Sequence, residues 1–148
     1  MKISAQVVNR AGSHSVQVKT NDTLHPLEIA PKAGSPGSSV NGGELLFLAL
    51  ATCYCNDIYR EAAKRGIRVE QVEVEVEGEF GGEGEPAHGV TYRARLSGDA
   101  SPAELRELAR ITDGVAEIQN TLRGSTPVAL SQVEVQSTQS SLPQASGI

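Results

Sequence analysis

One uninterrupted segment constrains the fold most. It reads ELLFLALATCYCNDIYREAAKR, begins at Glu44 and meets no glycine or proline until Gly66. It is rich in leucine, alanine, glutamate, lysine and arginine, so it predicts a long helix. Its first half, Leu45 to Cys55, is apolar on every side, and the charges gather in the second half. A helix that is apolar all round must be covered all round, so we expect the first half to be a core helix.

Strand patterns lie on both sides of this helix. Valines alternate with polar residues around a turn at residues 9–14, which predicts a hairpin, and a third strand is expected over 24–29. Residues 31–43 are rich in glycine, proline and serine and predict an irregular connection. After the helix, valines alternate with glutamates over 72–77, and a returning strand is expected over 90–96. We interpret the glutamate row as a solvated face that protects an edge, not as a cation site.

The last third predicts two helices, a strand and a tail. Ser101-Pro102-Ala103-Glu104 combines a capping box with proline at the first helical position, and that helix should end near Thr112. A short helical stretch over 115–122 and a last strand over 128–135 should follow, before a polar tail at 137–148. Because strands and helices are grouped apart, the sequence predicts one α+β domain over residues 1–136.

Composition excludes several classes of partner. Thirteen basic against 18 acidic residues give a net charge of −5, and aromatic residues are only 3% of the chain. This balance argues against nucleic acid and membrane surfaces as partners. The longest apolar run, Leu45 to Ala51, is too short to cross a bilayer, and the first residues show no signal-peptide pattern. We therefore expect a cytoplasmic protein.

Two cysteines are the candidate reactive groups. Cys53 and Cys55 are two residues apart, so on a helix they point to nearly opposite sides and form neither a redox pair nor a chelate. Cys53 shares its face with Asp57 and Arg60, and each cysteine taken alone is expected to be a small buried hydrophobe. A thiolate at Cys53 would need a guanidinium brought in from elsewhere. No metal-ligand spacing and no cofactor motif appears, so we expect neither a metal nor a cofactor.

The region PKAGSPGSSVNGGELLFLALATCYCNDIYREAAKRGI resembles the OsmC/Ohr family of osmotically inducible and organic hydroperoxide resistance proteins. Members carry a Pro-Gly loop, an Asn-Pro-Glu-like helix start, and an Ala-x-Cys in a long core helix that ends before a Gly-Ile turn. The resemblance implies the OsmC-like fold, with antiparallel sheets around a long core helix and two chains intertwined as a homodimer. The corresponding motifs here are Ser35-Pro36-Gly37, Asn41-Gly42-Gly43-Glu44-Leu45, Ala51-Thr52-Cys53, Gly66-Ile67 and Asn120-Thr121-Leu122-Arg123-Gly124.

The resemblance also implies a thiol-dependent peroxidase. The first cysteine, matched by Cys53, would attack the O–O bond of an organic hydroperoxide and become a sulfenic acid. A second cysteine would resolve it as a disulfide, and a small thiol or a lipoyl-type dithiol would reduce the pair. An arginine and a glutamate would assist the first cysteine, at two sites on the subunit interface.

The sequence departs from this family pattern at three places. Ala116 stands where the second cysteine is expected, with Glu117 in place of the following proline. The assisting glutamate falls on Gly43, with Glu44 one residue late, and Arg10 is the best candidate for the arginine.

Two hypotheses follow. In the first, Cys53, Arg10 and Glu44 form the site of a one-cysteine hydroperoxide reductase, and an external thiol resolves the sulfenic acid. In the second, the chain is a catalytically degenerate dimer that binds or senses a small apolar molecule in a pocket around Cys53. An arginine hydrogen-bonded to the Cys53 sulfur would argue against the second hypothesis.

Overall fold

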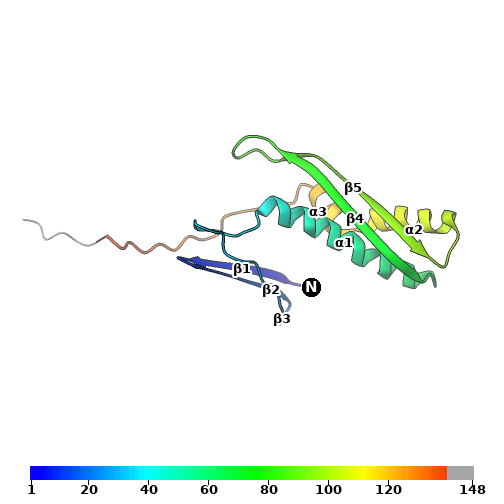
Figure 1. Ribbon diagram of the computed structural model, residues 1–148, viewed down its shortest axis with the longest axis horizontal. Coiled ribbons are helices and arrows are strands. Elements are labelled where there is room, and N and C mark those ends of the chain that lie inside the picture. The colour runs from blue at the N-terminus through cyan, green and yellow to red at the C-terminus, as the bar shows by residue number, and fades with distance from the viewer. Residues whose placement is uncertain (140–148) are drawn as a thin grey trace, which may run out of the picture.

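A computed structural model describes residues 1–139 of the 148-residue chain (Figure 1). Two antiparallel sheets and three helices confirm the predicted α+β class. The expected polar tail falls mostly on residues 140–148, outside the described residues. The elements are β1 (Ile3–Arg10), β2 (Ser13–Thr20), β3 (Thr23–His25), α1 (Gly42–Lys64), β4 (Val69–Phe80), β5 (Ala87–Gly98), α2 (Pro102–Val115) and α3 (Glu117–Arg123).

The long helix α1 is confirmed and carries defined caps at both ends. Asn41 Oδ1 accepts a hydrogen bond from the backbone N–H of Glu44 at 2.8 Å, and Glu44 Oε2 accepts one from the N–H of Asn41 at 2.8 Å. This capping box satisfies two backbone donors that would otherwise lack a partner. At the other end Gly66 takes a φ of 65°, and the N–H of Ile67 donates to Ala62 O at 3.0 Å. The positive φ explains why glycine follows this helix.

The core lies under the second half of α1, and the expectation that the first half is the covered one is wrong for the single chain. Ile58 and Leu108 are 0% exposed, and they pack with Tyr54, Ala62 and Ala116 between α1, α2 and the β4–β5 hairpin. Figure 1 shows this hairpin running obliquely across α1. On the first half Leu48 is 60% exposed. Leu108 of α2 packs against the second half, whereas β4 contacts the first half through Phe80, which stacks on Phe47.

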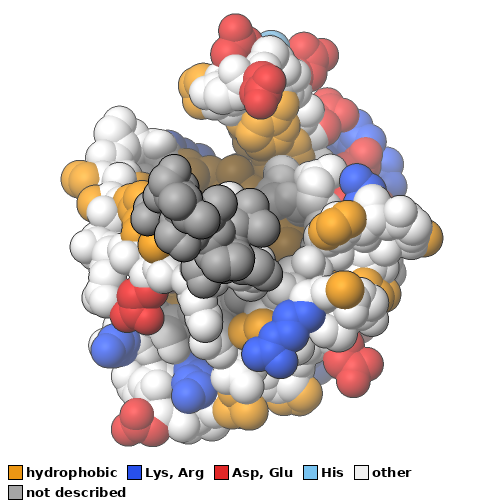
Figure 2. All heavy atoms as spheres, turned by 90° about the vertical axis from the view of Figure 1, so that its left-hand side faces the viewer, with side chains coloured by type: hydrophobic (Ala, Val, Ile, Leu, Met, Phe, Trp, Pro, Cys, Tyr) orange, Lys and Arg blue, Asp and Glu red, His pale blue; other side chains and the backbone are white. Residues whose placement is uncertain are grey.

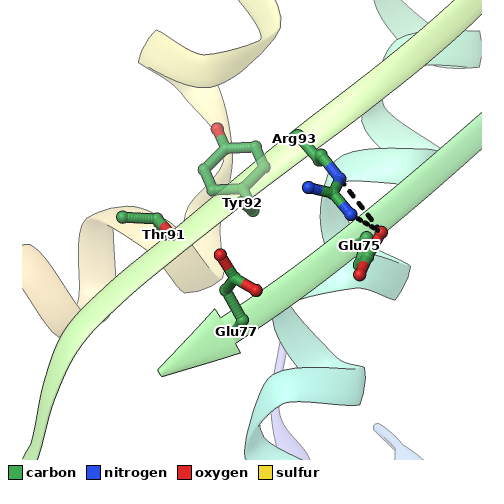
Figure 3. Close-up of a pocket in the computed structure, with 5 residues that line it drawn as sticks. All are labelled: Glu75, Glu77, Thr91, Tyr92 and Arg93. Atoms are coloured by element: carbon green, nitrogen blue, oxygen red, sulfur yellow. Dashed lines mark hydrogen bonds and ion pairs between the residues drawn. The ribbon is translucent and has the colours of Figure 1, made fainter. Parts of the chain in front are cut away.

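The β4–β5 hairpin confirms the predicted alternation. Val72 pairs with Leu96, Val74 with Ala94 and Val76 with Tyr92, and this face turns toward the core. Glutamates on the outer face pair with arginines across the strands, as between Arg93 and Glu75 at 2.5 Å. Figure 3 shows this pair beside a shallow pocket of about 70 Å³. The outer face is thus a charged, solvated surface, as the sequence predicts.

The β1–β3 sheet forms the predicted N-terminal hairpin, but its third strand ends at His25, short of the expected 24–29. Val7 pairs with Val16 and is 62% exposed, and Ile3 is 65% exposed. Within residues 1–139, no other helix or strand packs extensively against this sheet. One face of the sheet therefore carries apolar side chains that the single chain leaves uncovered.

Two predictions about the last third are wrong. α2 continues through Gly114 to Val115 instead of ending near Thr112, and the ion pair from Arg123 to Asp113, at 2.7 Å, secures its end. The expected last strand over 128–135 is absent from the described residues, and Val128 is 97% exposed. This segment pairs with neither the β1–β3 sheet nor the β4–β5 hairpin, although strand alternation alone predicts pairing. No helix within residues 1–139 is long and apolar enough to span a membrane.

Candidate functional site

Cys53 lies half-buried on α1 and faces two carboxylates. Its Sγ donates toward Asp57 Oδ2 at 3.6 Å and toward Glu117 Oε2 at 3.8 Å. Asp57 is one helical turn further along α1, on the same face as Cys53, which the spacing predicts. Glu117 is the first residue of α3, and it reaches the sulfur because α3 packs against α1. The immediate surroundings of the thiol are therefore acidic.

Arg60 holds both carboxylates in place. Its Nη1 lies 3.0 Å from Asp57 Oδ1 and 2.9 Å from Glu117 Oε1, and its Nε lies 3.2 Å from Glu61 Oε1. Each of the two carboxylates facing Cys53 thus has one oxygen on the guanidinium and the other toward the sulfur. The side chain of Asp57 is 8% exposed and that of Glu117 is 62% exposed. One partner is buried and the other is open to solvent.

The electrostatics favour the thiol form of Cys53. Burial raises its pKa above the ordinary 9.0, and the charges of Asp57 and Glu117 raise it further, against a lowering effect of the backbone at Ile118. Burial and the hydrogen bond to Glu117 raise the pKa of Asp57, whereas hydrogen bonding from the backbone and from Asp57 lowers that of Glu117. A guanidinium is nearby, as a reactive cysteine requires, but it binds the carboxylates instead of the sulfur.

The structure does not bring the other two expected site residues to Cys53 within one chain. Glu44 is occupied in the capping box at the start of α1. Arg10 ends β1 and lines a pocket with residues 31–37. At Gly43 a Cβ atom would lie 2.7 Å from Cε2 of Phe80, so this ring occupies the space that a side chain there would need.

The position expected for a second cysteine is part of the core. Ala116 is 0% exposed and forms the junction between α2 and α3. Cys53 packs against the same cluster. Cys55 lines a different pocket with Ala51 and Val74, and both cysteines are free. The helical spacing correctly predicts that the two sulfurs do not pair.

Three atoms at the site are potential metal ligands. The sulfur of Cys53 and one oxygen each of Asp57 and Glu117 lie within 4.8 Å of one another. Arg60 already supplies a positive charge to both carboxylates. Ion pairing with Arg60 alone accounts for the arrangement.

An apolar groove opens beside the site, one to two turns earlier on α1. It has a volume of about 640 Å³ and is lined by Leu46, Leu50, Val90, Tyr92 and Gln119, among others. Gln119 is 3% exposed and donates to Leu50 O at 3.0 Å, while its Oε1 has no partner within residues 1–139. Figure 2 shows hydrophobic side chains at the back of a hollow beneath the tip of the β4–β5 hairpin. Cys53 does not line this groove.

Sequence reasoning places two neighbours of Cys53 on its face without assigning them to the site. Asp57 and Arg60 follow from helical spacing, since both share the face of Cys53. From sequence, Glu117 is identified only as the residue in place of the family's proline. No local pattern connects it with Cys53, because the two residues are 64 positions apart. Its approach to Cys53 depends on how α3 packs against α1.

Comparisons with known proteins agree with this architecture. The sequence model of the family described as OsmC-like protein matches residues 35–131, about two thirds of the chain. No curated protein matches. An OsmC-like protein from Mycoplasma pneumoniae is similar in structure, with a TM-score of 0.62, 19% identity, and coverage of 84% of this chain and 89% of that one.

Two further solved structures are similar. One is described as an organic hydroperoxide resistance protein OsmC, predicted redox protein, from Legionella pneumophila. It has a TM-score of 0.56, 20% identity, and coverage of 84% of this chain and 90% of that one. The other is an OsmC-like protein of unknown function from Vibrio cholerae, with a TM-score of 0.53, 17% identity, and coverage of 82% and 93%. At these identities the likeness concerns the fold.

Proposed function

The chain belongs to the OsmC-like protein family, and from this premise we propose that it reduces organic hydroperoxides with Cys53 as its single peroxidatic cysteine. The observation that carries the proposal is the position of the Cys53 sulfur. It is half-buried, and it faces two carboxylate oxygens at 3.6 and 3.8 Å whose partner oxygens are held by Arg60. A thiol beside groups that can accept and return a proton has the acid–base partners that peroxide cleavage needs.

The proposed reaction oxidises the sulfur by two electrons. Cys53–SH and ROOH give Cys53–SOH and ROH. With Ala116 at the position expected for a second cysteine and Cys55 in a different pocket, the sulfenic acid must meet a thiol from outside the chain. A small thiol or a lipoyl-type dithiol fits this role. We also propose a cytoplasmic location, where such thiols keep cysteines reduced.

We propose further that the working form is a homodimer. Two features support it: the apolar face of the β1–β3 sheet and the exposed first half of α1, where Leu48 is 60% exposed. Contiguous apolar surface of this kind is typical of protein interfaces. Arg10 and Glu44 belong to the proposed site only in such a dimer, since one chain does not carry them to Cys53.

Single-turnover oxidation tests the proposed function. Reduced protein is mixed with cumene hydroperoxide, and the adduct is trapped and located by mass. We expect one oxygen atom on Cys53, with consumption of peroxide in the presence of dithiothreitol. Cys53→Ser should abolish consumption, and Cys55→Ser, which alters a cysteine in a different pocket, is the matched control. If wild type and Cys53→Ser consume cumene hydroperoxide equally, the proposed peroxidase activity of Cys53 is rejected.

The apolar groove favours the second candidate, a dimer that binds or senses a small apolar molecule. Its volume of about 640 Å³ falls within the range of small-molecule sites, and its lining is mainly apolar. The fluorescent probe 8-anilinonaphthalene-1-sulfonate can report on it. Saturable binding that Val90→Asp abolishes, in a protein inert to hydroperoxides, would support this candidate over the peroxidase.

A further inference from the structure

We propose that Glu117, together with Asp57, carries the proton of the Cys53 thiol to the oxygen that leaves the hydroperoxide, and that Arg60 is the positioning residue for both carboxylates. This inference rests on the proposed function and assigns roles to three residues other than Cys53, Arg10 and Glu44. Glu117 contacts the reacting sulfur and is therefore a catalytic residue in this proposal, whereas Arg60 acts through the carboxylates.

The geometry supports a relay. Asp57 Oδ2 and Glu117 Oε2 lie 3.6 and 3.8 Å from the sulfur, and with the sulfur they form a triangle in which all distances are within 4.8 Å. Arg60 fixes the opposite oxygens at 3.0 and 2.9 Å, so the inner oxygens stay directed at the thiol. A proton accepted from the sulfur stays beside the reaction, because both acceptors belong to one cluster.

The proposed steps conserve atoms, protons and electrons. As the sulfur attacks the terminal oxygen of ROOH, the S–H bond breaks and its proton moves to Glu117. The S–O bond forms, the O–O bond breaks, and RO⁻ leaves with the electron pair of that bond. The carboxyl pair then returns one proton to RO⁻, which gives ROH and restores the starting ionisation. The peroxide is reduced, the sulfur is oxidised, and no metal or cofactor takes part.

The charged groups around the thiol fit this role. Asp57 and Arg60 face it from α1, and Glu117 faces it from α3. In the adjoining core the hydroxyls of Tyr54 and Tyr92 are bonded to Ala109 O and to Asp113. One oxygen of Asp57, which is buried, lies within 4.8 Å of one oxygen of Glu117, which is solvent-exposed, so the protonation of one carboxyl affects the other. Glu117 is the member from which bulk water can restore a proton.

A charge-removing substitution separates this relay from a simple electrostatic effect. Glu117→Gln, in a Cys55→Ser background, removes the acceptor and one negative charge near the sulfur. Without that charge the thiolate forms more easily, so alkylation of Cys53 by iodoacetamide should accelerate severalfold. The iodide that leaves in this reaction needs no proton, so alkylation does not depend on the relay. Reaction with cumene hydroperoxide should instead slow by about tenfold or more, at the lower end of what a positioned acid–base group contributes.

Each outcome is decisive. Faster alkylation with slower peroxide reaction supports the relay. Acceleration of both reactions would show that Glu117 only restrains the thiol, and an unchanged peroxide rate would show that it has no part in the step; either overturns the relay. A wild-type protein inert to hydroperoxide but open to alkylation would instead reject the proposed function itself.

Two variants complete the experiment. Glu107→Gln removes an exposed carboxylate of α2 that is paired with Arg110, at 2.6 Å, and should leave both rates unchanged. Arg60→Ala should lower the peroxide rate and flatten its pH dependence, since the carboxylates lose their anchor. If Arg60→Ala has the same peroxide rate and pH profile as wild type, Arg60 does not position the two carboxylates.

Discussion

Glu117 Oε2 lies 3.8 Å from the sulfur of Cys53, although the two residues are 64 positions apart. Together with Asp57 it surrounds the cysteine with negative charge, the opposite of the cationic surroundings that lower a thiol's pKa. On the alignment expected from sequence, Ala116 and Glu117 stand at the positions of the family's second cysteine and following proline. The substitution therefore removes a thiol and adds a carboxylate at the same end of α3.

The titration of Cys53 should reflect this charge. Because burial, Asp57 and Glu117 all raise its pKa, the midpoint of the alkylation rate against pH should lie above the ordinary 9.0. Iodoacetamide labelling of the Cys55→Ser protein, followed by mass spectrometry between neutral and alkaline pH, measures the midpoint. Glu117→Gln should move it downward. A midpoint below 9.0 in the wild type would mean that a cation outside this cluster reaches the sulfur.

Neighbouring glycines at the start of α1 should respond in opposite ways to alanine. A Cβ at Gly42 meets nothing within 4 Å, whereas one at Gly43 lies 2.7 Å from Phe80, whose ring stacks on Phe47 at 5.9 Å. Gly42→Ala should be neutral or stabilise by about 0.5 kcal/mol through reduced entropy of the unfolded chain. Gly43→Ala should destabilise by about 1 kcal/mol, because the ring must move.

Urea denaturation of both variants measures the difference. Phe80→Leu combined with Gly43→Ala should recover most of the loss, since it removes the aromatic edge. Equal stabilities of Gly42→Ala and Gly43→Ala would show that Phe80 does not rest on α1 in solution. The same comparison indicates whether a glutamate could be restored at position 43.

The exposed half of α1 should control association. We expect Leu48→Asp to convert the proposed dimer to a monomer, because a charge at the centre of an apolar interface would be buried without a partner. Sedimentation velocity over a range of protein concentrations measures the change. Arg106→Glu, on the exposed face of α2, is the control and should remain dimeric. A wild-type protein that is monomeric at all concentrations would contradict the homodimer.

The distinction between the two halves of α1 also shows the limit of sequence reasoning. The breaker-free segment predicts the helix, because propensity is local. The helix begins at Gly42, two residues before the expected Glu44, where Asn41 and Glu44 form a capping box. The apolar residues around Leu48 predict that a cover is required, and this stays a prediction. They do not say whether the same chain supplies the cover, and in the single chain none does.

The candidate site shows the same limit: neighbours on one helix follow from the sequence, and contacts between helices do not. Asp57 and Arg60 could be placed beside Cys53, since helix geometry relates positions four and seven residues apart. Glu117 could not, because its position depends on α2 extending to Val115 and on the turn at Ala116 that starts α3. The segment over 128–135 has the alternation of a strand, but alternation alone does not provide a neighbouring edge.

Lowering the pH should lower the free energy of unfolding, partly because the carboxylate of Glu61 becomes protonated. Its carboxylate is 5% exposed and lies 2.8 Å from Lys64, 3.0 Å from Arg65 and 3.2 Å from Arg60. Hydrogen bonds from Lys64 and Arg65 lower its pKa from the ordinary 4.5 to about 2. A group with a depressed pKa in the folded state stabilises the protein fully above its unfolded value. That contribution declines as the pH falls from 4.5 toward 2.

Glu61→Gln isolates this contribution, since glutamine keeps the shape and loses the charge. We expect the variant to be less stable than wild type at pH 7, with a difference in unfolding free energy that is constant above about pH 5.5 and shrinks below 4.5 as the wild-type carboxylate becomes protonated. Urea denaturation at pH 7, 4 and 3 measures it. Glu107→Gln, whose carboxylate is 53% exposed, should show a much smaller difference at every pH because surface ion pairs contribute little. A difference for Glu61→Gln that is the same at pH 7 and pH 3 would show that packing, and not the charge of Glu61, accounts for the loss.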